Sequence, residues 1–559
     1  MGGAKRVSGP SRSSPEAFYK EYFGFAPSEP QRRCYESLYL ARDLPLLATV
    51  VLPTGEGKTE AVVAPFLAQF VDGVFPIAPR LVYVLPSRSL SDQTAGRICK
   101  YAHEIEKATK RQIIVNTQHG GHPEDPFFFS DVVVSTLDQF VYAYARAQQQ
   151  AKSHPDISAG SIAASLVVFD EAHGYDPYTL SMVKAMIQIL HAARVPVVLM
   201  SATLPPALKA DLLPRRATAT EITLTGLPRI QRQIPIKLID EPLVEESCRL
   251  PGILTERLAT ARKALIVCNE VSRAQQLYLG LKRWLQEQGL LDALPVTLIH
   301  SRFTQQDRER LQGVVEQMLG ENGTGGIVVS TQVCEAGLNL SAELVVTEFA
   351  PADALVQRAG RCARFKGESG EVWIFAGGEP AKYTYGNSKM GEMALDATLS
   401  YLRSNPDLDL GDWGMVQDFC RVLPYSTNEA AAAESLRELQ EATLYADNSP
   451  QRIRVRDELS AYFWVGNAAR KLPLTSESYR ASLVSVSVRR LWGFLEYLQS
   501  SKSGGKKASL EQLVWKSAEG AYSLEEKGQP QAFRTYRLDP QYYSSCLGVC
   551  YDGPAPCEQ

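Results

Sequence analysis

The sequence predicts an α/β protein with two parallel-sheet domains in tandem and a C-terminal accessory domain. Short apolar runs rich in β-branched residues alternate with amphipathic helical stretches, which is typical of parallel sheets covered by helices on both faces. The runs form two series, separated by a Pro- and charge-rich stretch from about residue 205 to 245. After about residue 386 the alternation stops, and helical segments, a Gly/Lys/Ser linker at 501–509 and an aromatic-rich tail follow.

Each apolar run is bounded by turn or helix signals and is expected as one strand. The first series comprises residues 46–52, 81–85, 112–116, 131–135, 166–169, 196–200 and 221–225. The second comprises residues 264–268, 296–300, 326–330, 344–348 and 371–375. The expected organisation is a flexible arm at 1–15, sheet domains at 16–225 and 226–385, and an accessory domain at 386–559.

Composition limits the possible partners. The chain has 559 residues, 45% of them hydrophobic, and a formal net charge of −3. Without an overall basic charge, any nucleic-acid contact must come from locally placed amides, hydroxyls and a few cations. No apolar run approaches the ~20 residues needed to cross a bilayer, and the N-terminal arm lacks the apolar centre of a signal peptide. We therefore expect a cytoplasmic protein without a membrane partner.

A phosphate-binding loop is expected directly after the first strand, where the sequence reads VLPTGEGKTEA. A strand, a glycine-containing loop and a helix start provide backbone N–H groups and a helix N-terminus for phosphate oxygens. Lys58 can reach the β and γ phosphates, and the Thr59 hydroxyl can bind Mg²⁺. Leu52 stands where the full pattern has its first glycine. The expected ATP contacts are Thr54, Gly55, Glu56, Gly57, Lys58 and Thr59.

Two adjacent carboxylates follow the strand in LVVFDEAH. Asp170 comes at the carboxyl end of a parallel strand, where such sheets bind their ligands. It is expected to hold Mg²⁺ through water, and Glu171 to accept a proton from the attacking water. A helix N-cap with an acidic first turn is the alternative explanation for this pair.

Arginines recur at intervals of three in VQRAGRCAR, at Arg358, Arg361 and Arg364. Such spacing places them on one face of a helix, within a sector of about 120°. That face could present fixed cations to one anionic target, or it could be an ordinary solvated, salt-bridged face.

Taken in order, these motifs resemble those of a superfamily 2 helicase of the DEAH type, which has two RecA-like domains. PSEPQ, with Gln31, resembles the adenine-sensing Q motif, and MSATLP resembles the motif that couples ATP state to strand separation. STQVCEAGLNLS resembles motif V and QRAGRCAR resembles motif VI. The motifs run from residue 31 to 364 in family order.

The resemblance assigns further roles. Gln357, Arg361 and Arg364 would face the nucleotide as catalytic residues, because a positioned arginine stabilises charge on the transferred phosphoryl group. Arg358 is as well explained by a structural ion pair. Additional ATP contacts are implied for Gln31, Gly337 and Asn339, and coupling roles for His173, Ser201 and Thr203.

Nucleic-acid contacts are implied by LPSRSLSDQ (85–93), HGG (119–121) and STLDQ (135–139), which resemble motifs Ia, Ic and Ib. In the second domain, IHSRF (299–303) and Thr331 would supply them. Small hydroxyls, glycines and backbone amides suit the tracking of phosphates without base reading. An ordinary turn or helix cap is the alternative for each segment. The implied residues are Ser87, Arg88, Gly120, Gly121, Ser135, Thr136, Ser301, Arg302 and Thr331.

A closer similarity is to the helicase part of the CRISPR-associated helicase-nuclease of type I systems. It rests on IHSRFTQQDRE, TQVCEAGLNLS and EFAPADALVQRAGRCAR. It implies ATP-dependent, 3′ to 5′ translocation on single-stranded DNA and recruitment by a crRNA-guided surveillance complex. None of the seven histidines is followed by Asp, so no nuclease activity is expected here, and a separate HD nuclease subunit is expected as a partner. The alternatives are a general superfamily 2 DNA or RNA helicase outside CRISPR immunity, and a nucleotide-gated nucleic-acid clamp that does not unwind.

Overall fold

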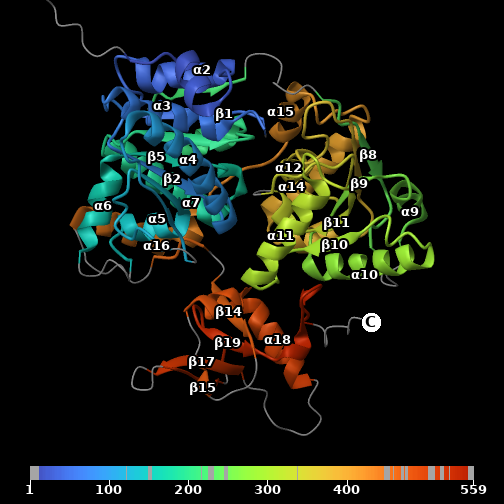
Figure 1. Cartoon of the computed structure of the whole chain (residues 1–559). Helices are drawn as coiled ribbons and strands as arrows, with labels where there is room; N and C mark the ends of the chain where they lie inside the picture. The colour runs from blue at the N-terminus through green and yellow to red at the C-terminus, as the bar shows by residue number, and fades with distance from the viewer. Residues whose placement is uncertain are drawn as a thin grey trace, which may run out of the picture. The chain divides into compact units, whose positions relative to one another are not determined.

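The structure is a computed structural model, shown in Figure 1. It divides into two compact units, residues 1–231 with 424–457 and residues 232–423 with 458–559. The described residues are all except 1–11, 54, 121–122, 149–153, 216, 225–231, 245–249, 336–337, 446–452, 457–458, 467–470, 473–475, 501–509, 517–520, 528 and 552–559.

The first unit is built on a seven-stranded parallel sheet with the order β3-β4-β2-β5-β6-β1-β7. Every strand expected in the first series is present, although the run expected from residue 112 begins at Val115. The strands are β1 Leu47–Val51, β2 Arg80–Leu85, β3 Val115–Gln118, β4 Val132–Thr136, β5 Ser165–Phe169, β6 Val197–Ser201 and β7 Thr220–Thr223.

Helices cover both faces of this sheet because successive strand residues point to opposite sides. Val50 belongs to the core on one face, and Leu47, three residues earlier in β1, to the core on the other. The first face is covered by α1 Pro15–Phe18, α2 Glu29–Tyr35, α3 Lys58–Asp72 and α4 Arg88–Thr109, with π-helical turns at Tyr19–Phe23 and Glu36–Leu40. The second is covered by α5 Leu137–Tyr144, α6 Pro155–Ala163, α7 Pro177–Ala192 and α8 Pro206–Leu212.

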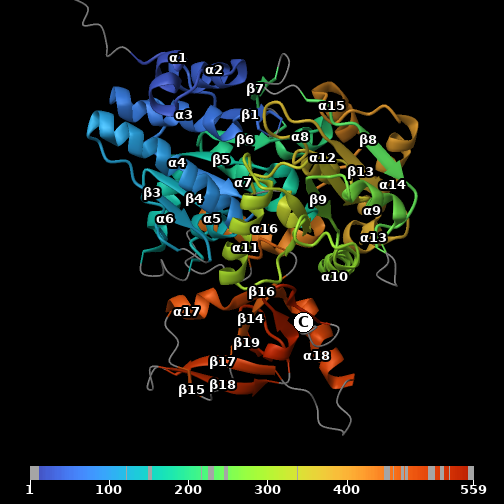
Figure 2. The ribbon, with the colours of Figure 1, turned by 45° about the vertical axis from the view of Figure 1, so that its right-hand side comes forward.

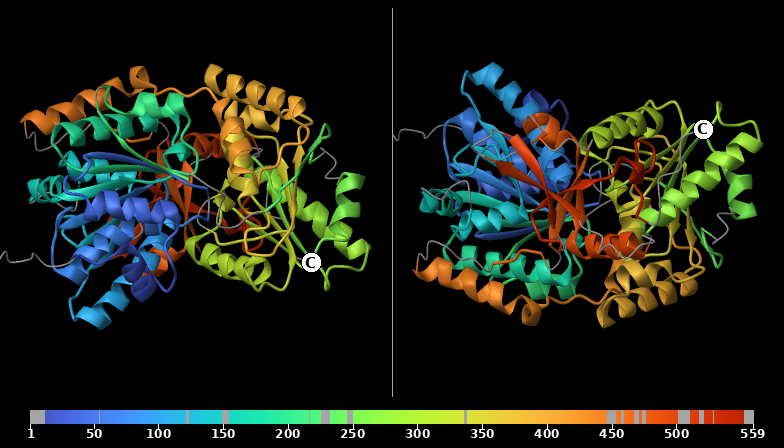
Figure 3. Two further views of the ribbon diagram at one scale, coloured as in Figure 1. Left: turned by 90° about the horizontal axis from the view of Figure 1, so that it is seen from above. Right: turned by 90° about the horizontal axis from the view of Figure 1, so that it is seen from below.

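A later part of the chain also packs on this unit. Helix α16, Glu429–Tyr445, lies beside α7, as both views of Figure 3 show. Its Ala432 and Leu439 belong to the same buried core as α5 and α7. Ile453 and Val455 extend that core. Part of the region expected as an accessory domain thus contributes to the first unit.

The second unit contains a six-stranded parallel sheet with the order β10-β11-β9-β12-β13-β8. All strands of the second series are found, and β8, Ile236–Ile239, is an additional edge strand from the stretch expected as a connection. The others are β9 Lys263–Val267, β10 Val296–Ile299, β11 Gly326–Ser330, β12 Leu344–Glu348 and β13 Glu371–Phe375. The helices are α9 Gly252–Leu258, α10 Val271–Glu287, α11 Gln305–Leu319, α12 Ala352–Ala359, α13 Pro380–Tyr385, α14 Lys389–Ser404 and α15 Trp413–Arg421, with a 3₁₀ turn at Gln332–Cys334.

The same unit carries a mixed six-stranded sheet with the order β15-β18-β17-β19-β14-β16 (Figure 2). Its strands are β14 Ser460–Val465, β15 Lys471–Leu472, β16 Leu483–Ser487, β17 Leu510–Lys516, β18 Ala521–Lys527 and β19 Thr535–Leu538. Helix α17 spans Ser476–Ala481, and α18, Val488–Ser500, packs Leu491 and Phe494 against Phe463 of the sheet. After a 3₁₀ turn at Pro540–Tyr542, a short hairpin of β20 Tyr543–Ser544 and β21 Gly548–Val549 follows. The sequence patterns did not predict this sheet.

The expected fold class is confirmed: two tandem parallel-sheet domains and a C-terminal domain. Among the described residues, no helix combines the length and the apolar character that crossing a membrane requires.

Candidate nucleotide site and strand-binding edge

The predicted phosphate loop lies between β1 and α3 in the first unit. Gly55 and Gly57 have φ angles of 95° and 74°, a region that residues with a Cβ rarely adopt. A Cβ on Gly57 would collide with the amide nitrogen of Gln31. The loop therefore requires glycine at position 57, and α3 begins directly afterwards at Lys58. Thr54 lies outside the described residues.

Gln31 holds this loop from α2. Its Nε2 donates to the carbonyl of Gly57 at 3.2 Å, and its Oε1 accepts from the backbone N–H of Ser28 at 2.9 Å. The side chain is buried, with 1% of its surface exposed. The loop and the start of α2 are thereby fixed to each other, while the adenine contact stays a prediction.

The structure brings together the predicted lysine and the predicted carboxylates. Lys58 Nζ lies 3.3 Å from Glu171 Oε1. Asp170 is buried and accepts from the hydroxyl of Tyr83 at 2.7 Å and from the N–H of Glu171 at 2.8 Å. Glu171 has a φ of 54°, an uncommon value for a residue with a Cβ, so its placement comes with backbone strain.

Electrostatics at this edge favour binding of a cation. Burial, followed by the nearby charge of Glu171, raises the pKa of Asp170 to about 6, although Lys58 opposes this. Burial destabilises the charged form of this carboxylate, and a cation bound beside it would stabilise that form.

The observed residues fit a triphosphate and a divalent cation. The left-handed glycines leave room beside the N-terminus of the 15-residue α3, and Lys58 and Asp170 supply a cation and a carboxylate at one edge of the sheet. Thr59 is buried, and its hydroxyl accepts from Arg97 at 3.5 Å.

Two residues at this site were missed by sequence reasoning. Tyr83 was read as one member of an apolar strand, yet its hydroxyl is the partner of Asp170. Arg97, from α4, reaches both Thr59 and Glu60. A tyrosine in an otherwise aliphatic buried strand was the available signal for the first, and no local signal indicates the second.

The coupling candidates follow neighbouring strands. Ser201 is the last residue of β6, and its hydroxyl donates to the carbonyl of Thr203. The backbone N–H of Thr203 donates to Ser201 Oγ at 3.2 Å. The Thr203 hydroxyl is buried and has no hydrogen-bond partner among the described residues. His173 lies in the 3₁₀ turn at Ala172–Gly174.

In the second unit, Arg358 forms a structural ion pair with Glu335. It is fully buried and contacts Glu335 at 2.8 Å, the hydroxyl of Thr347 at 2.6 Å and that of Tyr385 at 3.0 Å. This bears out the structural alternative for Arg358. Because α12 ends at Ala359, the other two arginines of the series lie beyond the helix on which all three were expected.

Arg361 and Arg364 lie at the start of the segment after α12. The guanidinium of Arg361 donates to the carbonyls of Leu338 at 2.7 Å and Glu335 at 2.6 Å, so it holds the motif V loop. Arg364 is half-buried, and its backbone N–H donates to Ser341 Oγ at 2.8 Å. Gln357 is buried and Asn339 is exposed, while Gly337 lies outside the described residues.

The residues of the first unit that are expected to contact nucleic acid lie at or just after the carboxyl ends of the adjacent strands β3, β4 and β2. Ser87 caps α4 and is exposed, as is Arg88, whose guanidinium lies against Gly120. Ser135 and Thr136 are buried, and the Ser135 hydroxyl donates to the carbonyl of Gln118 at 3.0 Å. Gly121 lies outside the described residues.

In the second unit, the C-terminal hairpin covers part of the IHSRF segment, residues 299–303. Ser301 is exposed, but Arg302 is 6% exposed, and its guanidinium lies 4.5 Å from the ring centre of Tyr551. Thr331 is buried. Ser301 is therefore the accessible member of this expected set.

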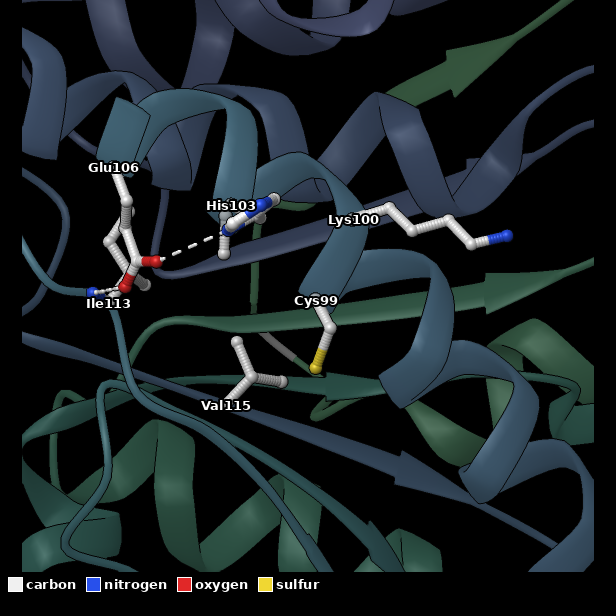
Figure 4. A pocket seen from close by; sticks show the side chains of 7 residues that line it. Cys99, Lys100, His103, Glu106, Ile113 and Val115 are labelled. Atoms are coloured by element: carbon white, nitrogen blue, oxygen red, sulfur yellow. Dashed lines mark hydrogen bonds and ion pairs between the residues drawn. The ribbon is translucent and has the colours of Figure 1, made fainter. Parts of the chain in front are cut away.

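A separate pocket of about 450 Å³ lies between α4 and β3 (Figure 4). Cys99 and His103 of α4 line it with Val115, and Glu106 accepts from the N–H of Ile113 at 2.7 Å. It contains no residue of the phosphate loop or of the expected strand contacts, and we assign it no role.

Comparison with known proteins agrees with the motifs. The DEAD/DEAH box helicase family matches residues 28–210, and the family described as CRISPR-associated nuclease/helicase Cas3, C-terminal, matches residues 260–367. The chain therefore carries a DEAD/DEAH box helicase domain and a Cas3-like C-terminal helicase domain. The resemblance stated from the sequence is thereby confirmed.

Among its Cas3 relatives is the CRISPR-associated helicase Cas3 of Thermoproteus tenax, 26% identical over 62% of this chain and 59% of that protein. The chain spans about a third to three fifths of the length of the curated Cas3 relatives that it matches. The crystal structure of T. fusca Cas3 with ATP has a TM-score of 0.64 at 21% identity, over 85% of this chain and 66% of that one. A chain of a pre-nicking CRISPR RNA-guided surveillance complex has a TM-score of 0.58 at 20% identity, over 90% of this chain and 68% of that one. The structures share the fold.

Proposed function

We propose that this chain is an ATP-dependent helicase that translocates 3′ to 5′ on single-stranded DNA in type I CRISPR interference. The observation that carries the proposal is the pairing of Lys58 with Glu171 beside the buried Asp170, next to a glycine loop that opens α3. The Cas3 family match supports the CRISPR setting.

The chain's own residues suggest how hydrolysis proceeds. The N–H groups at the start of α3 and the Lys58 ammonium bind phosphate oxygens, and binding draws Lys58 away from Glu171. Glu171, released from its ion pair, accepts the proton of the attacking water. Asp170 and Thr59 would hold Mg²⁺, which neutralises charge on the β and γ phosphates when bound.

Arginines of the second domain complete the proposed reaction. We assign Arg364 and Arg361 to the γ-phosphoryl oxygens, with Gln357 beside them. Because Arg361 also holds carbonyls of the motif V loop, a shift of this side chain would move that loop. ATP turnover and strand movement would be linked through this contact.

The partners we propose are single-stranded DNA, a crRNA-guided surveillance complex and a separate HD nuclease subunit. The likeness to a chain in a surveillance-complex structure supports the second partner. None of the seven histidines in these 559 residues precedes an aspartate, which supports assigning DNA cutting to residues outside these.

DNA-stimulated ATP hydrolysis by the full chain tests the proposal. Glu171→Gln should lower kcat by about 10² to 10⁴-fold, the usual contribution of a general base, while ATP binding persists. Lys58→Ala should abolish hydrolysis and weaken ATP binding. Lys209→Ala, which removes an ammonium of α8 that pairs with Glu221, is the control and should leave both unchanged. Wild-type turnover by the Glu171→Gln protein would refute the assigned mechanism.

A further inference from the structure

The segment 453–456, which we call the strap, follows α16 in the sequence and packs on the first unit. Ile453 and Val455 are buried, at 5% and 1% exposure, in the core shared with α5 and α7. Arg454 and Arg456 alternate with them and are exposed. An extended segment with this alternation presents its arginines to the outside.

Hydroxyl groups of α5 and α7 fix the strap backbone. Tyr142 donates to the carbonyl of Ile453 at 3.3 Å, and Tyr178 to that of Arg454 at 3.1 Å. Thr179 donates to the carbonyl of Val455 at 3.2 Å. Because consecutive carbonyls are all held, the direction of the Arg456 side chain is set by the first domain.

Arg456 connects the turns of motifs Ia and Ib, which are expected to contact nucleic acid. Its Nε lies 3.0 Å from both carboxylate oxygens of Asp138, and its Nη2 donates to the carbonyl of Pro86 at 2.8 Å. Pro86 directly precedes Ser87 in motif Ia, and Asp138 follows Thr136 in motif Ib. The two turns leave neighbouring strands, since Leu85 pairs with Thr136.

The arginine is oriented and still accessible. Its side chain is 46% exposed although Asp138 and Pro86 engage one side of the guanidinium. A guanidinium held this way can offer its outer N–H groups to a phosphate without losing further side-chain freedom. The exposed Ser87 and Arg88 belong to the same edge.

We propose that Arg456 binds a phosphate of the single-stranded DNA and holds the turns of motifs Ia and Ib in position for it. This inference rests on the proposed function, since it adds a strand contact from outside the helicase motifs. Arg456 is a binding and positioning residue and takes no part in the chemistry of ATP.

The test compares Arg456→Gln with wild type in the full chain, using a single-stranded oligonucleotide. One lost phosphate contact should reduce the slope of log K against log salt concentration by about 0.7. We expect the DNA concentration for half-maximal ATPase stimulation to rise about tenfold, which corresponds to ~1.4 kcal/mol. ATPase activity without DNA should be unchanged.

Arg456→Lys keeps the cation and should retain the salt slope with a smaller loss of affinity. Arg437→Gln, which removes an exposed charge of α16, is the matched control and should change neither measurement. An Arg456→Gln protein with wild-type affinity and salt slope would overturn the inference alone. Absence of DNA binding by wild type would overturn the proposed function and the inference with it.

Discussion

The buried side chain of His300 connects the C-terminal hairpin to the IHSRF segment at residues 299–303. Its Nδ1 accepts from the N–H of Arg302 at 3.2 Å, so its Nε2 carries the proton and donates to the carbonyl of Leu547 at 3.0 Å. The ring stacks on Phe303. Burial, followed by the nearby charge of Arg302, lowers the pKa of His300 to about 3. The fold therefore requires a neutral imidazole.

This geometry predicts a pH dependence of stability. An unfolded histidine takes up a proton below about pH 6.5, whereas His300 in the folded protein stays neutral until about pH 3. The stabilisation is complete above the unfolded pKa and is lost as the pH falls toward the folded one. Between pH 7.5 and 5, wild type should lose roughly 2 kcal/mol of unfolding free energy more than His300→Gln. Urea denaturation at both pH values measures this, and equal losses would contradict it.

Strand positions could be predicted from the sequence because continuous apolar, β-branched runs identify buried parallel strands. β8 was missed because Ile236–Ile239 is only partly buried at the sheet edge, where such a run is not required. α16 and the strap were missed for a different reason. Their place on the first unit depends on contacts with α7, remote in sequence, that no local pattern encodes.

The docking of α16 and the strap on α7 depends on Tyr178. Its hydroxyl lies 3.0 Å from Ser435 Oγ and 3.1 Å from the carbonyl of Arg454. Tyr178→Phe should lower the unfolding free energy by about 1–3 kcal/mol, because buried partners lose their hydrogen bonds. Tyr383→Phe, at a residue of α13 that is 69% exposed, should change it little. Chemical denaturation measures both, and equal effects would argue against this role of Tyr178.

Across the whole molecule, sequence reasoning located the chemistry better than the accessory contacts. The motifs placed Lys58 and Glu171 at one site because both follow parallel strands, and the structure joins them at 3.3 Å. The motifs did not predict which side chains are buried. Ser135 and Arg302 were expected to contact nucleic acid, yet both side chains are buried. The chain passes between the two units near residues 231, 423 and 457. The strap, residues 453–456, lies between the last two of these positions in the sequence.

Strand displacement by the full chain tests directly whether the protein unwinds DNA with 3′ to 5′ polarity. A duplex with a 3′ single-stranded tail and one with a 5′ tail are each incubated with protein, Mg²⁺ and ATP, and release of the labelled strand is followed. We expect ATP-dependent release from the 3′-tailed duplex, little from the 5′-tailed one, and none with Lys58→Ala. DNA-stimulated ATP hydrolysis without release from either duplex would contradict this expectation and favour a nucleotide-gated clamp.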